Sequence, residues 1–311
     1  MIGLDLGGTK ILALAVSPGG GVLGRALHPT PRTGRADLVA ALSGAAREAC
    51  AAAGLELKDC AGVGVGAPGP TDPAGVVLEP PNLPADCREL PLGALLGDEL
   101  GLRVVVENDA NAAALGEQRF GAGRGHPDMI YVTVSTGIGG GVISGGRLLR
   151  GAGFMAGEVG HMLLAPEGGD VCGCGRTGCW EAISSGTGIV RQARAAMAEG
   201  AFAGGDAATL SAATVLQAAG AGDPAARRII ARAATYNGFG LLNLLHLFSP
   251  GRIVIGGGLT HAWDTLVGPA ADWALGHAMQ RAAAACRVVR AELGDLVGGL
   301  GAAAVLQGGG D

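Results

Sequence analysis

The stretch that decides the fold is Ile2-Gly-Leu-Asp5-Leu-Gly7-Gly8-Thr9-Lys10, a short apolar run that ends in a glycine-rich turn. It leads directly into a second apolar run, Ile11–Val16, and a Gly19-Gly20-Gly21 turn precedes a third run, Val22–Leu27. Apolar runs of this length, separated by glycine turns, are typical of strands joined by hairpins. The sequence therefore predicts that the chain begins with a three-stranded hairpin unit.

The same pattern returns later in the chain. Met129–Val134 leads into the glycine-rich stretch Ser135–Gly141, then into Val142-Ile143, a second turn and Arg147–Leu149. Because both copies place a threonine beside glycines, we interpret them as a duplication, which predicts two related lobes facing each other across a cleft. Helical stretches alternate with further strands, as α/β architecture requires. The longer helices are expected at 36–53, 110–120, 184–199, 210–219, 223–248 and 262–284.

Composition bounds the classes of function. The chain has 311 residues, a net charge of −5 and a pI of about 5.7, so nothing suggests a nucleic-acid or anionic-membrane partner. Hydrophobic residues make up 49% of the chain, but no stretch has the length of a transmembrane span and no signal peptide follows Met1. Three of the seven cysteines are explained by a metal motif, and the others are scattered through apolar stretches. This usage predicts a cytoplasmic protein.

The metal motif consists of one histidine and three closely spaced cysteines: His161, Cys172, Cys174 and Cys179. Thiolate and imidazole ligands favour Zn²⁺, and four protein ligands with no open position are typical of a structural site. Packed or disulfide-bonded cysteines are the alternative. A Cys-x-Cys pair closes too small a ring to bridge easily, however, and glycines surround these sulfurs. The sequence therefore predicts a structural zinc site flanked by two carboxylates, Glu158 and Glu181.

Two glycine turns are candidates for phosphate binding, Gly7-Gly8-Thr9 and Thr136-Gly137. Glycine lets backbone N–H groups converge on an anion. The order Gly8-Thr9-Lys10 does not match the P-loop motif, and prolines after Gly66 discount a dinucleotide-binding helix. Each turn alone is more often a tight hairpin. Together with Asp5, two residues before the first turn, they predict that nucleotide phosphates and Mg²⁺ bind between two lobes.

Asp109 follows an apolar strand and lies at the first turn of a predicted helix. Asp and Asn are preferred helix caps, and that is the simplest interpretation of a lone aspartate. A helix start also favours the ionised carboxylate, which can accept a hydroxyl proton during phosphoryl transfer. Because the metal motif and both glycine turns accompany it, we interpret Asp109 as a general base.

These motifs, in this order, resemble the ROK family (repressors, open reading frames and kinases), particularly its bacterial glucokinases. The resemblance covers nearly the whole chain and rests on Asp5–Lys10, Gly66–Pro70, Glu107–Asn111, Ser135–Gly141, Glu158–Glu181 and Ile255–Gly258. It implies a two-lobed α/β protein with the actin-like (ribonuclease H-like) ATPase fold. The expected lobes are 1–107, completed by the C-terminal segment 290–311, and 108–289, which carries the zinc motif 158–181.

The resemblance also implies a role for each site residue. Asp109 is expected to take the proton of the sugar 6-hydroxyl. Hexose-binding residues are expected at Gly66, Asn82, Asn108, Asp109, Glu158, His161 and Glu181. Nucleotide-binding residues are expected at Asp5, Gly7, Gly8, Thr9, Lys10, Thr136, Gly137, Gly256, Gly257 and Gly258. The implied reaction converts glucose to glucose 6-phosphate with ATP and Mg²⁺, in a homodimer or homotetramer.

The zinc site is expected to serve the sugar side of the reaction. A metal-bound His161 uses one ring nitrogen on zinc and offers the other to a partner, which the resemblance implies is a sugar hydroxyl. Cys179 lies two residues before Glu181, so it fixes where that carboxylate emerges. Loss of the metal is therefore expected to weaken sugar affinity much more than nucleotide affinity.

Two alternatives stay open. The first is a kinase for another hexose, such as N-acetylglucosamine, N-acetylmannosamine, mannose or fructose; Trp180 beside Glu181 favours glucose by resemblance. The second is a sugar-sensing ROK regulator without a DNA-binding module. Regulators that bind DNA need a helix-turn-helix module before the first strand, and here Met1 abuts that strand, so we expect an enzyme. The phosphate donor, whether ATP, another nucleotide or polyphosphate, is not readable from the residues.

Overall fold

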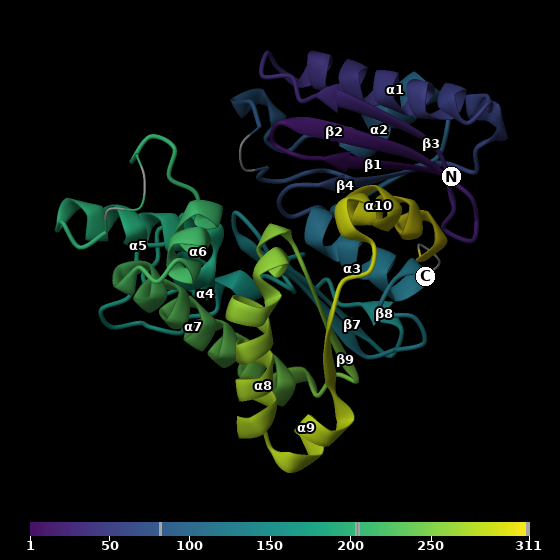
Figure 1. The fold of residues 1–311 in the computed structure, drawn as a ribbon. Helices are drawn as coiled ribbons and strands as arrows, with labels where there is room; N and C mark the ends of the chain where they lie inside the picture. Colours follow the sequence, from purple (N-terminus) through teal and green to yellow (C-terminus); the bar gives the residue numbers. More distant parts are fainter. Residues whose placement is uncertain (81–82, 203, 205, 309–311) are drawn as a thin grey trace. The chain divides into compact units, whose positions relative to one another are not determined.

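The computed structural model of the chain begins with an antiparallel meander of β1 (Ile2–Leu6), β2 (Lys10–Val16) and β3 (Val22–Pro29) (Figure 1). Two further strands, β4 (Val63–Ala67) and β5 (Val104–Asn108), continue the sheet in parallel with β1. The strand order is β3-β2-β1-β4-β5. The three-stranded hairpin unit that the sequence predicts is therefore present.

Helices cover both faces of this sheet (Figure 1). On one face α1 (Arg35–Ala52) packs against β1, β2 and β3, and α2 (Leu92–Leu100) packs against α1 and β5. On the other face α3 (Asp109–Phe120) packs against α10 (Val297–Gly308), which also contacts β1 and β4. The first sheet is thus the middle layer of an α/β sandwich.

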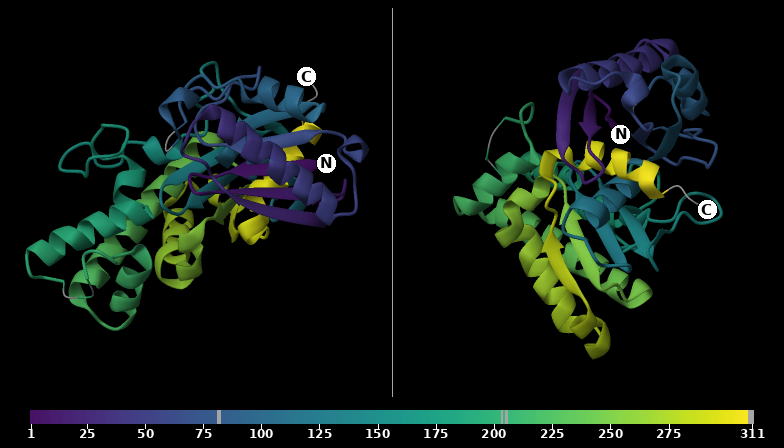
Figure 2. Two further views of the ribbon diagram at one scale, coloured as in Figure 1. Left: turned by 90° about the horizontal axis from the view of Figure 1, so that it is seen from above. Right: turned by 90° about the vertical axis from the view of Figure 1, so that its right-hand side faces the viewer.

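The close approach of α10 explains the glycines inside β1 and β4. A Cβ on Gly3 would lie 1.9 Å from the Gly299 carbonyl oxygen, and a Cβ on Gly64 would lie 1.8 Å from the Ala302 carbonyl oxygen. One apolar core joins this helix to β2 through Leu12, Leu14, Val16, Leu300 and Ala303. The last helix of the chain therefore completes the layers that its first strands begin, and Figure 2 shows it in yellow beside the purple N-terminal strands.

The second sheet repeats the topology of the first. Its strands are β6 (Met129–Val134), β7 (Ile138–Ser144), β8 (Arg147–Leu148), β9 (Arg252–Gly256) and β10 (Arg287–Arg290). Their order β8-β7-β6-β9-β10 matches β3-β2-β1-β4-β5 strand for strand. This match supports the predicted duplication. The predicted glycine-rich turn is shorter than expected, because residues 139–141 lie inside β7.

The remaining helices surround α7 (Pro224–Phe248), which begins where the Asp223 side chain accepts the N–H of Ala226. α7 packs against all five of the other α-helices in this part of the chain. The helices of this part of the chain are α4 (Trp180–Ser184), α5 (Gly186–Ala198), α6 (Ala212–Gly220), α8 (Gly268–His277) and α9 (Gln280–Ala285). Short turns of other helix types are η1 (Leu57–Asp59), η2 (Ala85–Cys87), η3 (Val159–His161), η4 (Gly258–Ala262), η5 (Trp263–Val267) and η6 (Gly294–Leu296).

Two predicted helices are interrupted in the structure. The range 184–199 contains the end of α4 and all of α5, because the Ser185 side chain caps the first turn of α5. The range 262–284 contains a π-helical turn, α8 and most of α9. At the second break the Met279 N–H bonds to His246 Nε2 of α7 at 3.1 Å. In both places a hydrogen bond outside the regular helical pattern accompanies the break.

Contacts divide the chain into two units, neither of which is one continuous segment. Unit 1 comprises Met1–Tyr131, Gly141–Gly157 and Ala291–Asp311, and unit 2 comprises Val132–Gly140 and Glu158–Arg290. The chain passes from one unit to the other four times. The structure describes residues 1–80, 83–202, 204 and 206–308. The lobe boundaries expected from the sequence stay a prediction.

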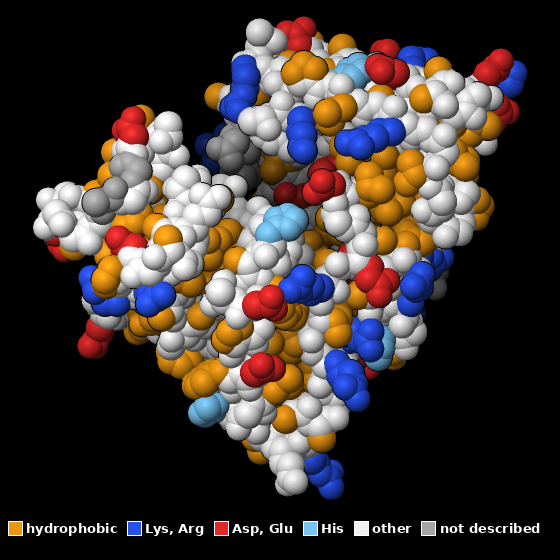
Figure 3. Space-filling model, viewed as in Figure 1, with side chains coloured by type: hydrophobic (Ala, Val, Ile, Leu, Met, Phe, Trp, Pro, Cys, Tyr) orange, Lys and Arg blue, Asp and Glu red, His pale blue; other side chains and the backbone are white. Residues whose placement is uncertain are grey.

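Charged side chains of both signs share the described surface. On the face that Figure 3 shows, Lys and Arg side chains are interspersed with acidic ones. Among the described helices, none is both long enough and apolar enough to cross a membrane.

Candidate active site and metal centre

His161, Cys172, Cys174 and Cys179 lie together in unit 2, with donor atoms all within 4.8 Å of one another. Cys172 Sγ is 3.7 Å from His161 Nδ1, and Cys174 Sγ is 3.7 Å from Cys179 Sγ. Zn–S bonds of about 2.3 Å in a tetrahedron place two sulfurs about 3.8 Å apart. The donor set and its spacing therefore fit a four-coordinate metal ion. We call these four residues the metal cluster.

The thiols of the metal cluster differ in their surroundings. Burial raises the pKa of the Cys179 thiol to about 12, whereas the backbone N–H of Arg176 lowers the pKa of Cys174, which is exposed. A buried thiol stays protonated at neutral pH unless a cation stabilises the thiolate. A bound metal ion would supply that stabilisation.

Two carboxylates adjoin the metal cluster. His161 Nε2 is 3.9 Å from Glu158 Oε2, so the ring nitrogen that faces away from Cys172 is directed at this carboxylate. Burial raises the pKa of Glu158, an effect that His161 opposes and Glu181 reinforces. Glu181 Oε1 is 3.7 Å from Cys172 Sγ. The structure thus brings Glu158, His161 and Glu181 together, as the sequence predicts.

The two glycine turns of unit 2 also lie side by side. A Cβ on Gly257 would lie 2.5 Å from the Val134 carbonyl oxygen, and a Cβ on Gly258 would lie 3.6 Å from Ser135 Oγ. Gly257 has a φ of 90°. The segment Gly256–Gly258 therefore meets the Thr136-Gly137 turn where β9 and β6 end.

In unit 1, Asp109 is an exposed residue at the start of α3. Its Oδ1 accepts the Ala110 N–H at 2.8 Å and the Asn108 Nδ2–H at 3.1 Å. Asn108 is the N-cap, and its own Oδ1 accepts the N–H groups of Ala110 and Asn111. The Asn108 amide also donates to the Gly69 carbonyl at 3.2 Å. Capping by Asn108 leaves Asp109 as the carboxylate in the first turn of α3.

A buried network that the sequence did not reveal supports this helix start. Glu107 is only 4% exposed. Its Oε1 accepts the Asn108 N–H at 3.0 Å and the Asn111 Nδ2–H at 3.1 Å, and its Oε2 accepts from Arg150 Nε at 2.8 Å. In the sequence, Glu107 is recognisable only as a charged residue at the end of an apolar strand. Its partner Arg150 is 43 residues away, and no local pattern links the two.

Predicted site residues lie next to one another at the ends of the neighbouring strands β1, β4 and β5. Asp5 pairs with Gly66, and Gly66 pairs with Glu107. Burial raises the pKa of Asp5, and Lys10 opposes this rise. A Cβ on Gly66 would lie 3.7 Å from Asp109 Cα. Asp5, Gly66 and the Asn108-Asp109 pair therefore share one edge of the first sheet.

The turn that follows β1 has its backbone oxygens bonded by side chains. Thr30 Oγ1 donates to the Gly7 carbonyl at 2.7 Å, and an Arg32 N–H donates to the Gly8 carbonyl at 2.8 Å. The Gly7 N–H closes the turn on the Lys10 carbonyl at 3.0 Å. Asn82, expected on the sugar side, lies outside the described residues.

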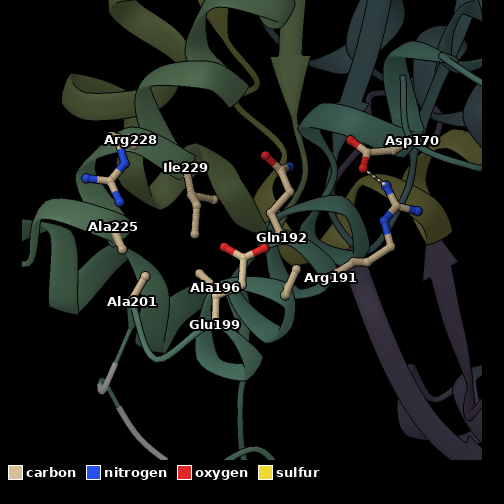
Figure 4. Close-up of a pocket in the computed structure, with 10 residues that line it drawn as sticks. Asp170, Arg191, Gln192, Ala196, Glu199, Ala201, Ala225, Arg228 and Ile229 are labelled. Atoms are coloured by element: carbon tan, nitrogen blue, oxygen red, sulfur yellow. Dashed lines mark ion pairs between the residues drawn. The ribbon is translucent and has the colours of Figure 1, made fainter. Parts of the chain in front are cut away.

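A surface pocket of about 440 Å³ lies between α5 and α7 of unit 2 (Figure 4). None of the predicted site residues is among its described lining residues. Its polar wall includes Asp170, which pairs with Arg191 at 3.5 Å and with Arg232 at 2.9 Å. Arg191 also donates to the Val171 and Ala182 carbonyls. These bonds fix the loop that leads to Cys172, so the polar side chains of the pocket stabilise the structure.

Trp180 is a core residue rather than a surface residue. It is 1% exposed, and its Nε1–H donates to Asn237 Oδ1 of α7 at 2.8 Å. A Cβ on Gly240 would lie 2.5 Å from the indole ring. The side chain therefore fixes α4 against α7 and has no free face for a sugar, so its presence gives no direct reason to prefer glucose.

Two sheets with the same strand order, covered by helices, are the architecture of the actin-like, two-lobed α/β ATPase fold. The chain belongs to the ROK family, whose family model matches residues 1–308. The sequence-based expectation of this family and fold is confirmed.

Three relatives illustrate the similarity. The glucokinase of Streptomyces coelicolor is 38% identical over 315 residues, covering 97% of this chain and 96% of its own. The N-acetylmannosamine kinase of Escherichia coli O157:H7 is 40% identical over 242 residues, covering 75% of this chain and 74% of its own. The crystal structure of a ROK family glucokinase from Streptomyces griseus in complex with glucose and AMPPNP has a TM-score of 0.80 at 37% identity and covers 99% of each chain.

Proposed function

We propose that this protein is an ATP-dependent glucokinase that converts glucose to glucose 6-phosphate. The observation that carries the proposal is the Asp109 carboxylate, held at the start of α3 by the Ala110 N–H and the Asn108 amide. Glucokinase relatives that align over nearly the whole chain support the choice of reaction.

Asp109 acts as the general base in this proposal. The helix start favours its ionised form, and the two hydrogen bonds fix its orientation. It takes the proton of the sugar 6-hydroxyl as that oxygen attacks the γ-phosphorus of ATP, while the bond from the γ-phosphorus to the β–γ bridging oxygen breaks and ADP leaves. Glu107 and Arg150 contribute indirectly. Glu107 accepts the backbone N–H of Asn108, and Arg150 in turn donates to the Glu107 carboxylate.

ATP and the hexose are held by different residues. Asp5 and the turn through Gly7, Gly8, Thr9 and Lys10 bind the phosphates and Mg²⁺, together with Thr136 and Gly137; Gly256, Gly257 and Gly258 lie on the adenosine side. ATP–Mg²⁺ supplies the phosphoryl group and neutralises charge that develops on it. The sugar hydroxyls are bound by Gly66, Asn82, Asn108, Glu158, His161 and Glu181. A carboxylate that accepts a sugar hydroxyl discriminates against analogues without it.

The metal cluster holds a structural Zn²⁺. Three thiolates and one imidazole with no open position are typical of such sites, and the spacing of the donor atoms fits. The purified protein is expected to contain one zinc ion per chain by elemental analysis, and Cys174→Ser is expected to lose it. A folded, active native chain without zinc would remove this assignment.

A coupled ADP-release assay over a panel of hexoses tests the proposed function. Glucose is expected to give the highest kcat/KM among glucose, mannose, fructose, N-acetylglucosamine and N-acetylmannosamine. N-acetylmannosamine is the second candidate, because a kinase for that sugar is 40% identical over three quarters of this chain. A higher kcat/KM for it would overturn the specificity and leave the kinase assignment standing. No phosphorylation of any hexose would overturn both.

The setting of the enzyme follows from the same family resemblance. We propose that it works in the cytoplasm as a homodimer or homotetramer, with no nucleic-acid or membrane partner. Sedimentation velocity of the purified chain distinguishes these assemblies from a monomer.

A further inference from the structure

We infer that Glu181 and Thr187 hold the Ser135–Ile138 turn in the shape that binds nucleotide phosphate, so that the segment after the metal cluster positions ATP as well as the sugar. This inference rests on the proposed function, which assigns Thr136 and Gly137 to phosphate and Glu181 to the sugar. It gives Glu181 a second role, as a positioning residue for the nucleotide.

The two oxygens of Glu181 face different neighbours. Oε2 accepts the Ile138 N–H at 2.9 Å, and Oε1 is directed at the metal cluster, 3.7 Å from Cys172 Sγ. A Cβ on Gly137 would lie 2.4 Å from Oε2, so glycine at this position makes room for the carboxylate. Glu181 therefore joins the metal cluster to the residue that follows Thr136-Gly137.

The other end of the turn is held by the start of α5. The Thr187 N–H and Thr187 Oγ1–H both donate to the Thr136 carbonyl, at 3.1 and 2.9 Å. The Gly186 N–H donates to the Ser135 carbonyl at 2.8 Å. With Glu181 on Ile138, these bonds fix the backbone on both sides of Gly137. Phosphate recognition by backbone N–H groups depends on how those groups are oriented.

The position of this segment follows from the metal cluster. Cys179 directly precedes α4, which carries Glu181 and is fixed on its buried side by Trp180. The break between α4 and α5 at Ser185 then brings Gly186 and Thr187 to the turn. The family resemblance implies a role for the metal on the sugar side. These contacts extend its influence to the nucleotide side of the same unit.

Glu181 variants separate the two roles. Glutamine can keep an oxygen on the Ile138 N–H while presenting an amide N–H₂ on its other side, whereas alanine removes both oxygens. Glu181→Ala is expected to bind AMPPNP–Mg²⁺ about ten-fold more weakly or worse, since a charge-assisted bond is lost. Glu181→Gln is expected to keep most of the AMPPNP affinity while losing glucose affinity.

Glu158→Ala is the matched control, because Glu158 contacts His161 rather than the turn. It is expected to lose only glucose affinity.

Thr187→Val tests the same turn without touching the metal cluster. Loss of one hydroxyl bond is expected to weaken AMPPNP binding about two- to ten-fold. Thr235→Val is its control, since Thr235 is also exposed and its hydroxyl donates to a helical carbonyl, that of Ala231. It is expected to bind AMPPNP as the native chain does.

Calorimetric titrations with AMPPNP–Mg²⁺ and with glucose, each alone, measure these affinities, and circular dichroism and zinc content verify each variant. Native AMPPNP affinity in folded, zinc-loaded Glu181→Ala overturns the inference. If Glu181→Ala does not fold, native affinity in Thr187→Val overturns it. A native chain that binds AMPPNP but phosphorylates no hexose overturns the proposed function instead, and the nucleotide titrations still decide the role of Glu181.

Discussion

At the scale of single residues, Asp109 carries the most direct prediction. Asp109→Asn is expected to abolish turnover while glucose still binds, because asparagine keeps an oxygen for the Ala110 N–H and loses only the proton acceptor. Loss of a general base costs ~10²–10⁴-fold in rate. The comparison is kcat of the variant and native chains at saturating ATP and glucose, with glucose binding measured by calorimetry. A kcat within a few fold of native would show that Asp109 is only a helix residue.

Glu117 carries a prediction about stability. It is fully buried in unit 1, and its carboxylate accepts N–H groups from Ala122 at 2.8 Å, Glu292 at 3.2 Å and Leu293 at 2.9 Å. Glu117→Ala removes the acceptor of three N–H groups, of which that of Ala122 is buried and the other two are partly buried, so it is expected to lower the free energy of unfolding by about 3 kcal/mol. Urea unfolding measures the change. Glu117→Gln keeps the shape and is expected to cost less; equal stability of all three chains would contradict the argument.

At the scale of elements, glycine-to-alanine substitutions are expected to have opposite effects in two helices, α10 and α8. A Cβ on Gly301 would lie 2.3 Å from the Ala112 carbonyl oxygen of α3. Gly301→Ala is therefore expected to destabilise the chain by about 1–3 kcal/mol through overpacking. A Cβ on Gly276 in α8 would meet no atom of the described neighbouring residues within 4 Å, so Gly276→Ala is expected to stabilise by up to about 1 kcal/mol. Thermal unfolding of both variants measures the two signs.

Some helix boundaries can be predicted from the local sequence, and others cannot. The start of α7 follows from the Asp223 cap and Pro224, both readable in the sequence. The two interrupted helices are different, because their breaks depend on Ser185 beside the Ser135–Ile138 turn and on His246 of α7. Alanine-rich sequence favours helix on both sides of the second break, and only the folded arrangement supplies the competing partner His246. One of the two breaks thus lies in the segment that holds the proposed phosphate turn.

The candidate site was predictable where residue type alone carries the chemistry. Three cysteines and a histidine indicate a metal wherever they meet, and the structure brings all four together. The supporting contacts were not predictable, since Glu107 and Arg150, or Glu181 and Ile138, are 43 residues apart in the sequence. Hydrogen bonds over such separations depend on strand order and register, which only the fold determines.

At the scale of the whole molecule, the C-terminal helix α10 packs against the N-terminal strands. Unit 1 starts with β1 and is completed by residues from Ala291 onward, after the chain has built unit 2. Unit 2, by contrast, takes all its segments from residues 132–290. The duplicated sheets share one strand order, but only the first is completed by a helix from the far end of the described chain. The core of unit 1 therefore depends on a helix that is made after all of unit 2.

This dependence predicts that a chain truncated after Arg290 fails to fold cooperatively. Without α10, the core residues Leu12, Leu14 and Val16 lose their cover, and Glu117 loses its bonds to the Glu292 and Leu293 N–H groups. Leu300→Ala is the milder variant. It keeps the helix and is expected to lower the free energy of unfolding by about 2–5 kcal/mol, because a buried leucine leaves a cavity. Calorimetric unfolding compares the three chains. A truncated chain that unfolds in a single transition with the native enthalpy would show that α10 is dispensable, since its helix would then contribute nothing to the core of unit 1.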